Sequence, residues 1–411
     1  MPDPSAAPGA GRPASRRDVL RALGVGLAGL PLAACATAPR PGPGSPGGTP
    51  VVRTVSPRTP LPAVVPPPGP GSPGGDTLVA QAGPGSPGDT VVADTTVAAV
   101  PAARETLRPR RIRPGGTIGL VAPAGVLRSV GQVETAVADM RAMGFETRVG
   151  RHALDRLGFL AGSDQNRADD FMAMVTDPDV DAVVCLRGGY GCARILPLLD
   201  YDAIRAAAKP IIGYSDVTAL LLAIYAKSGL VSFHGPVGIS SWTGTTATAF
   251  RDVLVRGETL AVRGETDRDR ITIETVRRGT AEGPLAGGNL SVVASLAGTG
   301  YLPDFDGHVV FFEETGEESY RLDRLFTQLE MAGVLRAPAA VVFGQCSQCS
   351  DGGSAWTAEE VLRDHLGAYR CPAWIGAPVG HVSPVYTLPV GLRVRTDADA
   401  GTLEAVGPAV V

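Results

Sequence analysis

Ser215 has the clearest chemical potential in this chain because of its place in the sequence. It follows a short β-rich apolar run at 210–213 and precedes an unbroken apolar run at 217–222, which predicts a turn from strand to helix. Such a turn can hold a serine nucleophile clear of its own backbone, beside the amides of a helix N-terminus. A helix N-cap is the commoner role for serine at this position, and Val217 replaces the second glycine of GxSxG.

A glycine-rich corner is the second feature that bears on chemistry. It reads Gly188-Gly189-Tyr190-Gly191 and follows directly on a strand-like run. Because glycine has no side chain, this backbone can approach a substrate closely and present free N–H groups. One wall of an oxyanion hole and a plain tight turn are both consistent with the pattern. A nucleotide phosphate loop is disfavoured, since the corner is neither GxGxxG nor a Walker loop.

A nucleophilic serine needs a general base, and histidine is the residue most often used. Among the five histidines, His234 and His381 lie beside glycine in segments that read as loops, and residue types do not choose between them. A histidine bonded to nearby backbone is the simpler interpretation of either one taken alone. His365 falls in a helical pattern and is expected at the surface, whereas His152 and His308 need only loop and strand-edge roles.

The base in turn needs a carboxylate to orient it. The apolar run 309–312 ends in Glu313 and Glu314, so an apolar strand delivers two acids at its end. A carboxylate buried at this point would need a partner, which a histidine could provide. A strand that simply emerges into solvent is the alternative interpretation.

The first 35 residues have the order of an export signal. The pair Arg16-Arg17 precedes a mildly apolar run at 22–32, which is too short to span a bilayer as a helix. The run ends in Leu32-Ala33-Ala34-Cys35, which resembles a bacterial lipobox. We therefore expect residues 1–35 to be a Tat-type lipoprotein signal. Cys35 would be acylated, and the exported protein would be anchored to the outer face of the cytoplasmic membrane.

Residues 36–107 are expected to form a disordered tether, because Pro, Gly, Ala, Thr, Ser and Val dominate them. The hexapeptide Gly-Pro-Gly-Ser-Pro-Gly starts at Gly42, Gly69 and Gly83, at uneven spacings that argue against a solenoid. Proline removes hydrogen-bond donors and glycine adds backbone entropy, so such a tract cannot bury a core. The formal net charge of the chain is −4 and no long basic run follows the tether, which gives no support to nucleic-acid binding.

The cysteines that follow Cys35 are odd in number, which excludes a complete disulfide framework. Cys346 and Cys349 have CxxC spacing, and both a local disulfide and two ordinary loop thiols are consistent with it. A metal site would need two more ligands, and Cys371 alone does not supply them, so no metal is expected. Cys185 lies in a strand-like run and is expected to be buried.

Strand and helix patterns alternate over residues 108–265. Strands are expected at 117–122, 145–149 and 181–186, and helices at 131–143 and from Ser163 to about 175. This alternation predicts an α/β domain with a parallel sheet and helices on both faces. Ser215 and the glycine-rich corner would then lie beyond the carboxyl ends of the strands, where such sheets bind ligands.

The rest of the chain has a different pattern. Residues 240–279 contain irregular polar runs and few helix signals. Beyond them, strands are expected at 308–312, 339–343, 391–396 and 402–406, and a helix at 320–332. We therefore expect a second, β-rich α+β domain over residues 280–411.

Seven segments in order resemble the serine LD-carboxypeptidases, the family of the muramoyltetrapeptide carboxypeptidases and the microcin-C-immunity peptidases. They are 119–125, 186–191, 212–216, 287–291, 312–317, 320–324 and 376–381. The resemblance covers nearly all of residues 108–411 and implies a Ser–His–Glu triad. Carried over by motif, Ser215 is the nucleophile, His381 the general base and Glu313 the acid that orients it. Glu314 stands one place beyond the family's glutamate, so the resemblance implies no role for it.

The same resemblance implies that the backbone amides of Asp216, Gly188 and Gly189 form the oxyanion hole. It implies a Rossmann-like N-terminal domain, a β-rich C-terminal domain and a homodimer that needs no cofactor. The implied activity is removal of a C-terminal D-amino acid from a muropeptide, a peptidoglycan-derived tetrapeptide. A microcin-immunity-like peptidase acting on amide-linked aminoacyl nucleotides and a non-enzymatic solute-binding lipoprotein are the alternatives. Well-known members are cytoplasmic, so the export signal sets this chain apart.

Overall fold

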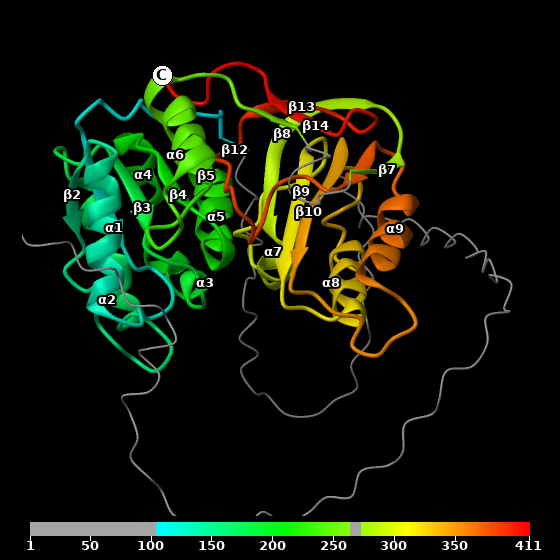
Figure 1. The fold of residues 1–411 in the computed structure, drawn as a ribbon, viewed down its shortest axis with the longest axis horizontal. Helices are drawn as coiled ribbons and strands as arrows, with labels where there is room; N and C mark the ends of the chain where they lie inside the picture. The colour runs from blue at the N-terminus through cyan, green and yellow to red at the C-terminus, as the bar shows by residue number, and fades with distance from the viewer. Residues whose placement is uncertain (1–103, 264–272) are drawn as a thin grey trace, which may run out of the picture. The chain divides into compact units, whose positions relative to one another are not determined.

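The computed structural model describes residues 104–263 and 273–411, which contain two sheets with helices packed on them (Figure 1). The expected signal, 1–35, and the expected tether up to residue 103 lie outside the described residues. No helix within the described ranges is both long and apolar enough to cross a membrane.

The first sheet has six strands in the order β12-β5-β4-β3-β1-β2. They are β1 (Thr117–Val121), β2 (Glu146–Val149), β3 (Ala182–Cys185), β4 (Ile211–Gly213), β5 (Ser232–His234) and β12 (Leu388–Val390). β1 to β5 pair in parallel, and β12 adds an antiparallel edge. β3 and β4 are buried along their whole length, which explains why their sequences are continuous apolar runs.

Helices cover both faces of the first sheet, as the alternating pattern predicted. They are α1 (Val130–Ala142), α2 (Asp164–Thr176), α3 (Cys192–Ile195), α4 (Tyr201–Ala207), α5 (Thr218–Ser228) and α6 (Gly244–Arg251). α2 begins at the expected cap, because the Ser163 Oγ accepts a hydrogen bond of 3.1 Å from the Asn166 N–H. α5 is apolar on nearly all sides and contacts both β4 of the first sheet and β8 of the second, which accounts for its burial.

The second sheet has eight strands in the order β6-β14-β13-β8-β9-β10-β11-β7. They are β6 (Ala261–Arg263), β7 (Glu274–Arg277), β8 (Thr280–Asn289), β9 (Val309–Thr315), β10 (Ala340–Ser347), β11 (Ala373–Ile375), β13 (Arg393–Asp397) and β14 (Thr402–Ala405). β8 to β11 pair in parallel and the outer strands antiparallel. The helices α7 (Leu290–Leu296), α8 (Ser319–Met331) and α9 (Ala358–Ala368) belong to this half of the chain (Figure 1). The α/β fold with a second strand-rich sheet is therefore confirmed.

Two local expectations were wrong. Residues 240–279 were expected to be irregular, but they contain α6 and a π-helical turn at Asp252–Arg256. β8 was also missed, because Pro and Gly interrupt its sequence. Its Gly287 has φ +139°, and a Cβ there would collide with the carbonyl oxygen of Phe311 on β9. The glycine that weakens the strand pattern is thus what lets two central strands approach each other.

The two sheets exchange strands across the expected domain boundary. β6 lies within the expected N-terminal range 108–265 but pairs with β14 in the second sheet. β12 lies within the expected C-terminal range 280–411 but pairs with β5 in the first sheet. The two domain ranges therefore stay predictions from the sequence, and the sheets themselves are interlocked by the chain.

Candidate active site

Ser215 lies at the corner between β4 and the short 3-10 turn Ser215–Val217 that leads into α5. Its φ of +64° places it in the left-handed region, which a non-glycine residue occupies only at a cost of about 1–3 kcal/mol. The side chain is partly exposed, and among the described residues its hydroxyl makes no capping hydrogen bond to the turn or to α5. The strained corner thus presents a hydroxyl that the fold does not use elsewhere.

The glycine-rich corner packs directly against Ser215. A Cβ added to Gly188 would lie 3.1 Å from both the Ser215 Oγ and the Asp216 nitrogen, so a side chain there would crowd the hydroxyl. In the described part of the chain, the amides of Gly188 and Gly189 donate no hydrogen bond. The Gly188 backbone and the Asp216 nitrogen therefore lie close to the Ser215 hydroxyl, and the oxyanion hole implied for these amides stays a prediction.

Asp216 links the corner to the turn through its side chain. Its buried carboxylate accepts a hydrogen bond of 2.9 Å from the Cys192 N–H at the start of α3. Burial raises the pKa of Asp216, and this hydrogen bond opposes the effect. The side chain of Asp216 is therefore structural.

Glu313 and His381 form a hydrogen-bonded pair. Glu313 is fully buried at the end of β9, and its Oε2 lies 2.8 Å from the His381 Nδ1. The second oxygen of Glu313 is buried and finds no hydrogen-bond partner in the part of the chain that the structure describes. Burial tends to lower the pKa of His381, but the hydrogen bond and the charge of Glu313 outweigh it, so the net direction is upward. The pair fixes the imidazole with its Nε2 directed away from the carboxylate.

Tyr214 brings the two halves of the site together. Its ring packs edge-on against the His381 ring with a centroid distance of 4.9 Å, and Ser215 is the next residue in the chain. Within the described residues, no hydrogen bond joins the Ser215 hydroxyl to His381. Such bonds are often long before substrate binds, so the roles of Ser215 as nucleophile, His381 as base and Glu313 as acid stay predictions.

His234, the other loop histidine considered as a base, is buried inside the protein. It ends β5, and both of its ring nitrogens are buried with no hydrogen-bond partner among the residues that the structure describes. Burial lowers its pKa to about 4, so the ring is neutral at pH 7. It packs edge-on against Phe311 at 5.1 Å and Tyr214 at 6.0 Å between centroids.

His365 corrects another expectation, because it is buried and not at the surface. Its Nδ1 lies 2.8 Å from the Glu330 Oε1 and its Nε2 lies 3.1 Å from the Asp323 Oδ1. The ring also stacks on Phe326 of α8 with a centroid distance of 5.1 Å. The helical pattern alone did not reveal that His365 lies on the face of α9 that packs against α8.

Two models of known protein families match this chain and show which family it belongs to. The model of the LD-carboxypeptidase N-terminal domain matches residues 118–235, and that of the C-terminal domain matches residues 282–396. The chain belongs to the LD-carboxypeptidase family. The resemblance carried by the seven segments is thereby confirmed, and the chain is a hydrolase of a carboxypeptidase family.

Individual family members agree with the models. The murein tetrapeptide carboxypeptidase of Pseudomonas aeruginosa is 32% identical over 286 residues, covering 67% of this chain and 91% of that protein. The crystal structure of a muramoyltetrapeptide carboxypeptidase from Oxalobacter formigenes is 29% identical with a TM-score of 0.63, covering 71% of this chain and 99% of that one. The microcin C7 self-immunity protein MccF, in its wild-type apo state, is 27% identical with a TM-score of 0.68, covering 74% and 100%.

Glu314, to which the family resemblance gives no role, has a clear structural one in this LD-carboxypeptidase homologue. It is buried and accepts hydrogen bonds from the Asn289 side chain at 2.9 Å, the Ser291 N–H at 2.8 Å and the Thr315 N–H at 2.9 Å. Burial raises its pKa, and these donors oppose the effect. Glu314 thus ties β9 to the start of α7, and Glu313 beside it is left for His381.

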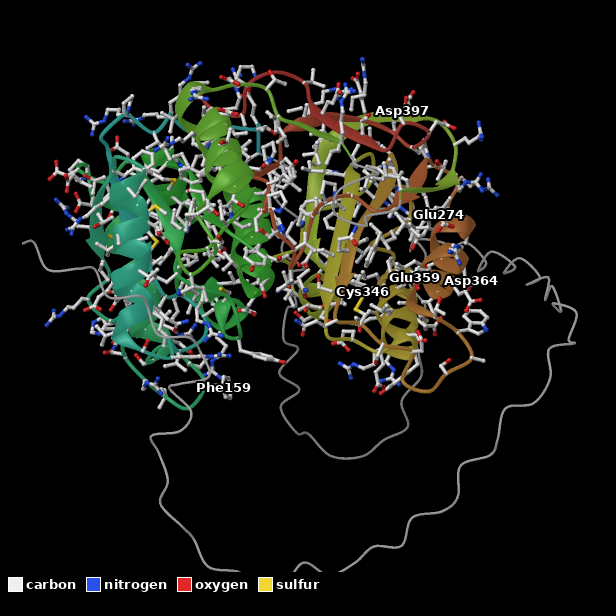
Figure 2. All side chains as sticks on the ribbon, viewed as in Figure 1. Phe159, Glu274, Cys346, Glu359, Asp364 and Asp397 are labelled. Atoms are coloured by element: carbon white, nitrogen blue, oxygen red, sulfur yellow. A yellow bond between two sulfur atoms is a disulfide. The ribbon has the colours of Figure 1, made fainter. Side chains whose placement is uncertain are left out.

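The CxxC pair is a disulfide in this LD-carboxypeptidase homologue. Cys346 and Cys349 are bonded at the end of β10, and Figure 2 labels Cys346. Ser347, which lies between them, donates a hydrogen bond of 3.1 Å from its hydroxyl to the His381 carbonyl oxygen. Cys185 is buried, as expected. The disulfide therefore closes the turn that supports the backbone of His381.

A cleft of about 450 Å³ opens beside Gly189 and was not predicted from the sequence. It lies where the chain leaves β1 and β3, the point at which the strand order of the first sheet reverses direction. We call it the arginine cleft, after Arg128, Arg156 and Arg187 in its lining. These residues are spread along the sequence without a motif, so only the rule that open α/β sheets bind ligands at this reversal could have found it.

Proposed function

We propose that this chain is a serine-type LD-carboxypeptidase that removes the C-terminal D-amino acid from peptidoglycan-derived tetrapeptides. The murein tetrapeptide carboxypeptidase named among its relatives supports the substrate class. The observation that carries the mechanism is the pairing of two features at one site. Ser215 is held at positive φ against the Gly188 backbone, and the His381–Glu313 pair packs against the adjacent Tyr214.

In the proposed reaction, the Ser215 Oγ attacks the carbonyl carbon before the terminal D-residue. The His381 Nε2 takes the hydroxyl proton, while Glu313 accepts a hydrogen bond from the Nδ1–H and stabilises the imidazolium. The carbonyl oxygen becomes an oxyanion that the amides around the corner can bind. His381 then returns the proton to the departing amine. Water attacks the acyl-enzyme by the same steps and releases the shortened peptide.

The direct test is incubation of residues 104–411 with the tetrapeptide L-Ala-γ-D-Glu-meso-diaminopimelate-D-Ala. We expect free D-Ala and the matching tripeptide, detected by mass spectrometry, because the proposed chemistry cuts one bond. A tetrapeptide that ends in L-Ala is the control and is expected to react far more slowly. If the protein released no amino acid from either peptide but cleaved an aminoacyl sulfamoyl nucleotide, the proposal would be contradicted. A microcin-immunity-like activity would then be favoured.

We also propose that the chain is an exported lipoprotein acylated at Cys35. The supporting features are the order of Arg16-Arg17, the apolar run and the Leu-Ala-Ala-Cys box in the sequence. In a bacterial host, the full chain is expected in the membrane fraction, and Cys35→Ser in the soluble fraction or unprocessed. Membrane association that Cys35→Ser leaves unchanged would contradict the lipid anchor. The homodimer implied by the resemblance stays a prediction.

A further inference from the structure

The arginine cleft carries positive charge that the protein itself does not neutralise. Its lining residues include three arginines and no acid, and among the described residues none of the three arginines forms an ion pair. Backbone carbonyls hold two of them in place. The Arg187 Nη1 donates to the Val126 oxygen at 2.6 Å, and the Arg156 Nη2 donates to the Leu127 oxygen at 2.8 Å. These bonds orient the guanidinium groups, and no acidic side chain within the described ranges pairs with them.

Among the arginines that line the cleft, Arg187 is the one joined in sequence to the glycine-rich corner that packs against Ser215. It immediately precedes Gly188, whose absent Cβ would stand 3.1 Å from the Ser215 Oγ. Its Nη2 lies 3.5 Å from the position that a Cβ on Gly189 would take. Its Nε is buried and has no hydrogen-bond partner among residues 104–263 and 273–411. Arg187 thus carries a half-buried guanidinium and immediately precedes the glycine that packs against the Ser215 hydroxyl.

The mouth of the cleft has an apolar wall. Phe159 and Tyr190 are 66% and 72% exposed, and their rings pack edge-on at 5.9 Å between centroids. Figure 2 labels Phe159, which belongs to the first half of the folded chain. Aromatic side chains exposed beside unpaired cations form a site suited to an anionic group attached to a hydrocarbon stem.

A carboxypeptidase has a specific need for such a site. It must recognise the free carboxylate of the departing residue, whose Cα lies about 3.8 Å beyond the Cα on the acyl side of the scissile bond. The planar guanidinium of arginine binds a carboxylate through two parallel hydrogen bonds, which a lysine cannot reproduce. Arg187 is the cleft arginine that immediately precedes Gly188, the glycine that packs against Ser215.

We propose that the arginine cleft binds the departing residue, with Arg187 as the residue that binds its free carboxylate. This inference rests on the proposed carboxypeptidase function and adds the basis of its exopeptidase specificity. Arg128 and Arg156 add positive potential at the same opening and draw the anionic end of the peptide into the cleft. The enzyme therefore removes one residue from a free C-terminus and discriminates against a peptide whose C-terminus is amidated.

The test compares the tetrapeptide with its C-terminal D-alaninamide analogue in residues 104–411. The wild-type protein is expected to have a kcat/KM for the carboxylate peptide roughly 10- to 100-fold above that for the amide peptide. This ratio corresponds to the free energy of a hydrogen bond between charged groups. Arg187→Met is expected to remove most of this preference by raising KM for the carboxylate peptide, while kcat/KM for the amide peptide changes little. Arg187→Lys is expected to restore part of the preference. Arg151→Met is the matched control, since Arg151 is exposed and does not line the cleft.

If Arg187→Met lowered kcat/KM equally for both peptides and left their ratio unchanged, the proposal would be overturned. Arg187 would then have a structural role in the backbone of the glycine-rich corner. If the wild-type protein hydrolyses neither peptide, the proposed function fails first. Calorimetric binding of both peptides to Ser215→Ala and to Ser215→Ala with Arg187→Met then decides the role of the cleft. A carboxylate preference that the second change abolishes would support it, and equal binding throughout would overturn it.

Discussion

Replacing Ser215 with alanine is expected to lower kcat on the tetrapeptide by at least about 10⁴-fold, since loss of a triad nucleophile leaves only binding and oxyanion stabilisation. Ser215→Gly should be equally inactive but more stable by about 1 kcal/mol, because glycine occupies the left-handed region without strain. The measurements are D-Ala release and the free energy of unfolding in urea. Opposite effects on activity and stability at one position are typical of a strained catalytic corner.

The matched control is Ser163, a serine with a demonstrated capping role. Its Oγ accepts from the Asn166 N–H at the start of α2. Ser163→Ala is expected to lose about 1 kcal/mol of unfolding free energy and to keep its kcat. If Ser215→Ala behaved like Ser163→Ala, losing stability while still releasing D-Ala at the wild-type rate, Ser215 would be a cap and the mechanism would be wrong.

Glu313→Gln is the second change with a large expected effect. The carboxylate accepts from the His381 Nδ1 and stabilises the imidazolium, so its loss is expected to lower kcat by about 10³- to 10⁴-fold. The pH profile gives an independent readout. Glu313 raises the pKa of His381 above its ordinary value of 6.5, and the base works only when neutral. Activity should therefore rise with pH through a midpoint above 6.5, and this midpoint should fall in Glu313→Gln, where burial alone acts on the imidazole.

Glu314→Gln separates a catalytic from a structural carboxylate at neighbouring positions. Glu314 accepts from three donors, and a glutamine amide would turn its NH₂ group toward one of them. We expect a loss of about 2 kcal/mol in unfolding free energy, with kcat and the pH midpoint little changed at temperatures where the protein is folded. The opposite assignment, with Glu314→Gln inactive and Glu313→Gln active at an unchanged pH midpoint, would contradict the triad.

The sequence predicted those parts of the fold that depend on local patterns. β3 and β4 were predicted because they are buried on both faces and so have continuous apolar sequences. β8 was missed because the close approach of Gly287 to Phe311 demands glycine where strand propensity demands a side chain. The burial of His365 was missed because it depends on the packing of α9 against α8, which the sequence pattern of one helix does not specify.

In the candidate site too, local sequence patterns predicted some features, whereas others depend on the packing of distant segments. The residue types at Ser215 and at 309–314 indicated a corner and a pair of acids, but they left His234 and His381 as equal candidates. Only the family resemblance chose between them, because contact between residues 313 and 381 depends on the packing of distant segments. The arginine cleft has no motif, since its three cations come together only where the chain leaves β1 and β3.

The most direct test of the account is covalent labelling of the folded protein with a fluorophosphonate probe, followed by peptide mapping by mass spectrometry. We predict one adduct, on Ser215, that forms more slowly in Glu313→Gln and is absent from Ser215→Ala, with loss of D-Ala release in proportion to labelling. Full activity after exhaustive exposure to the probe, with no adduct on Ser215 or with the adduct on another residue, would contradict the central claim.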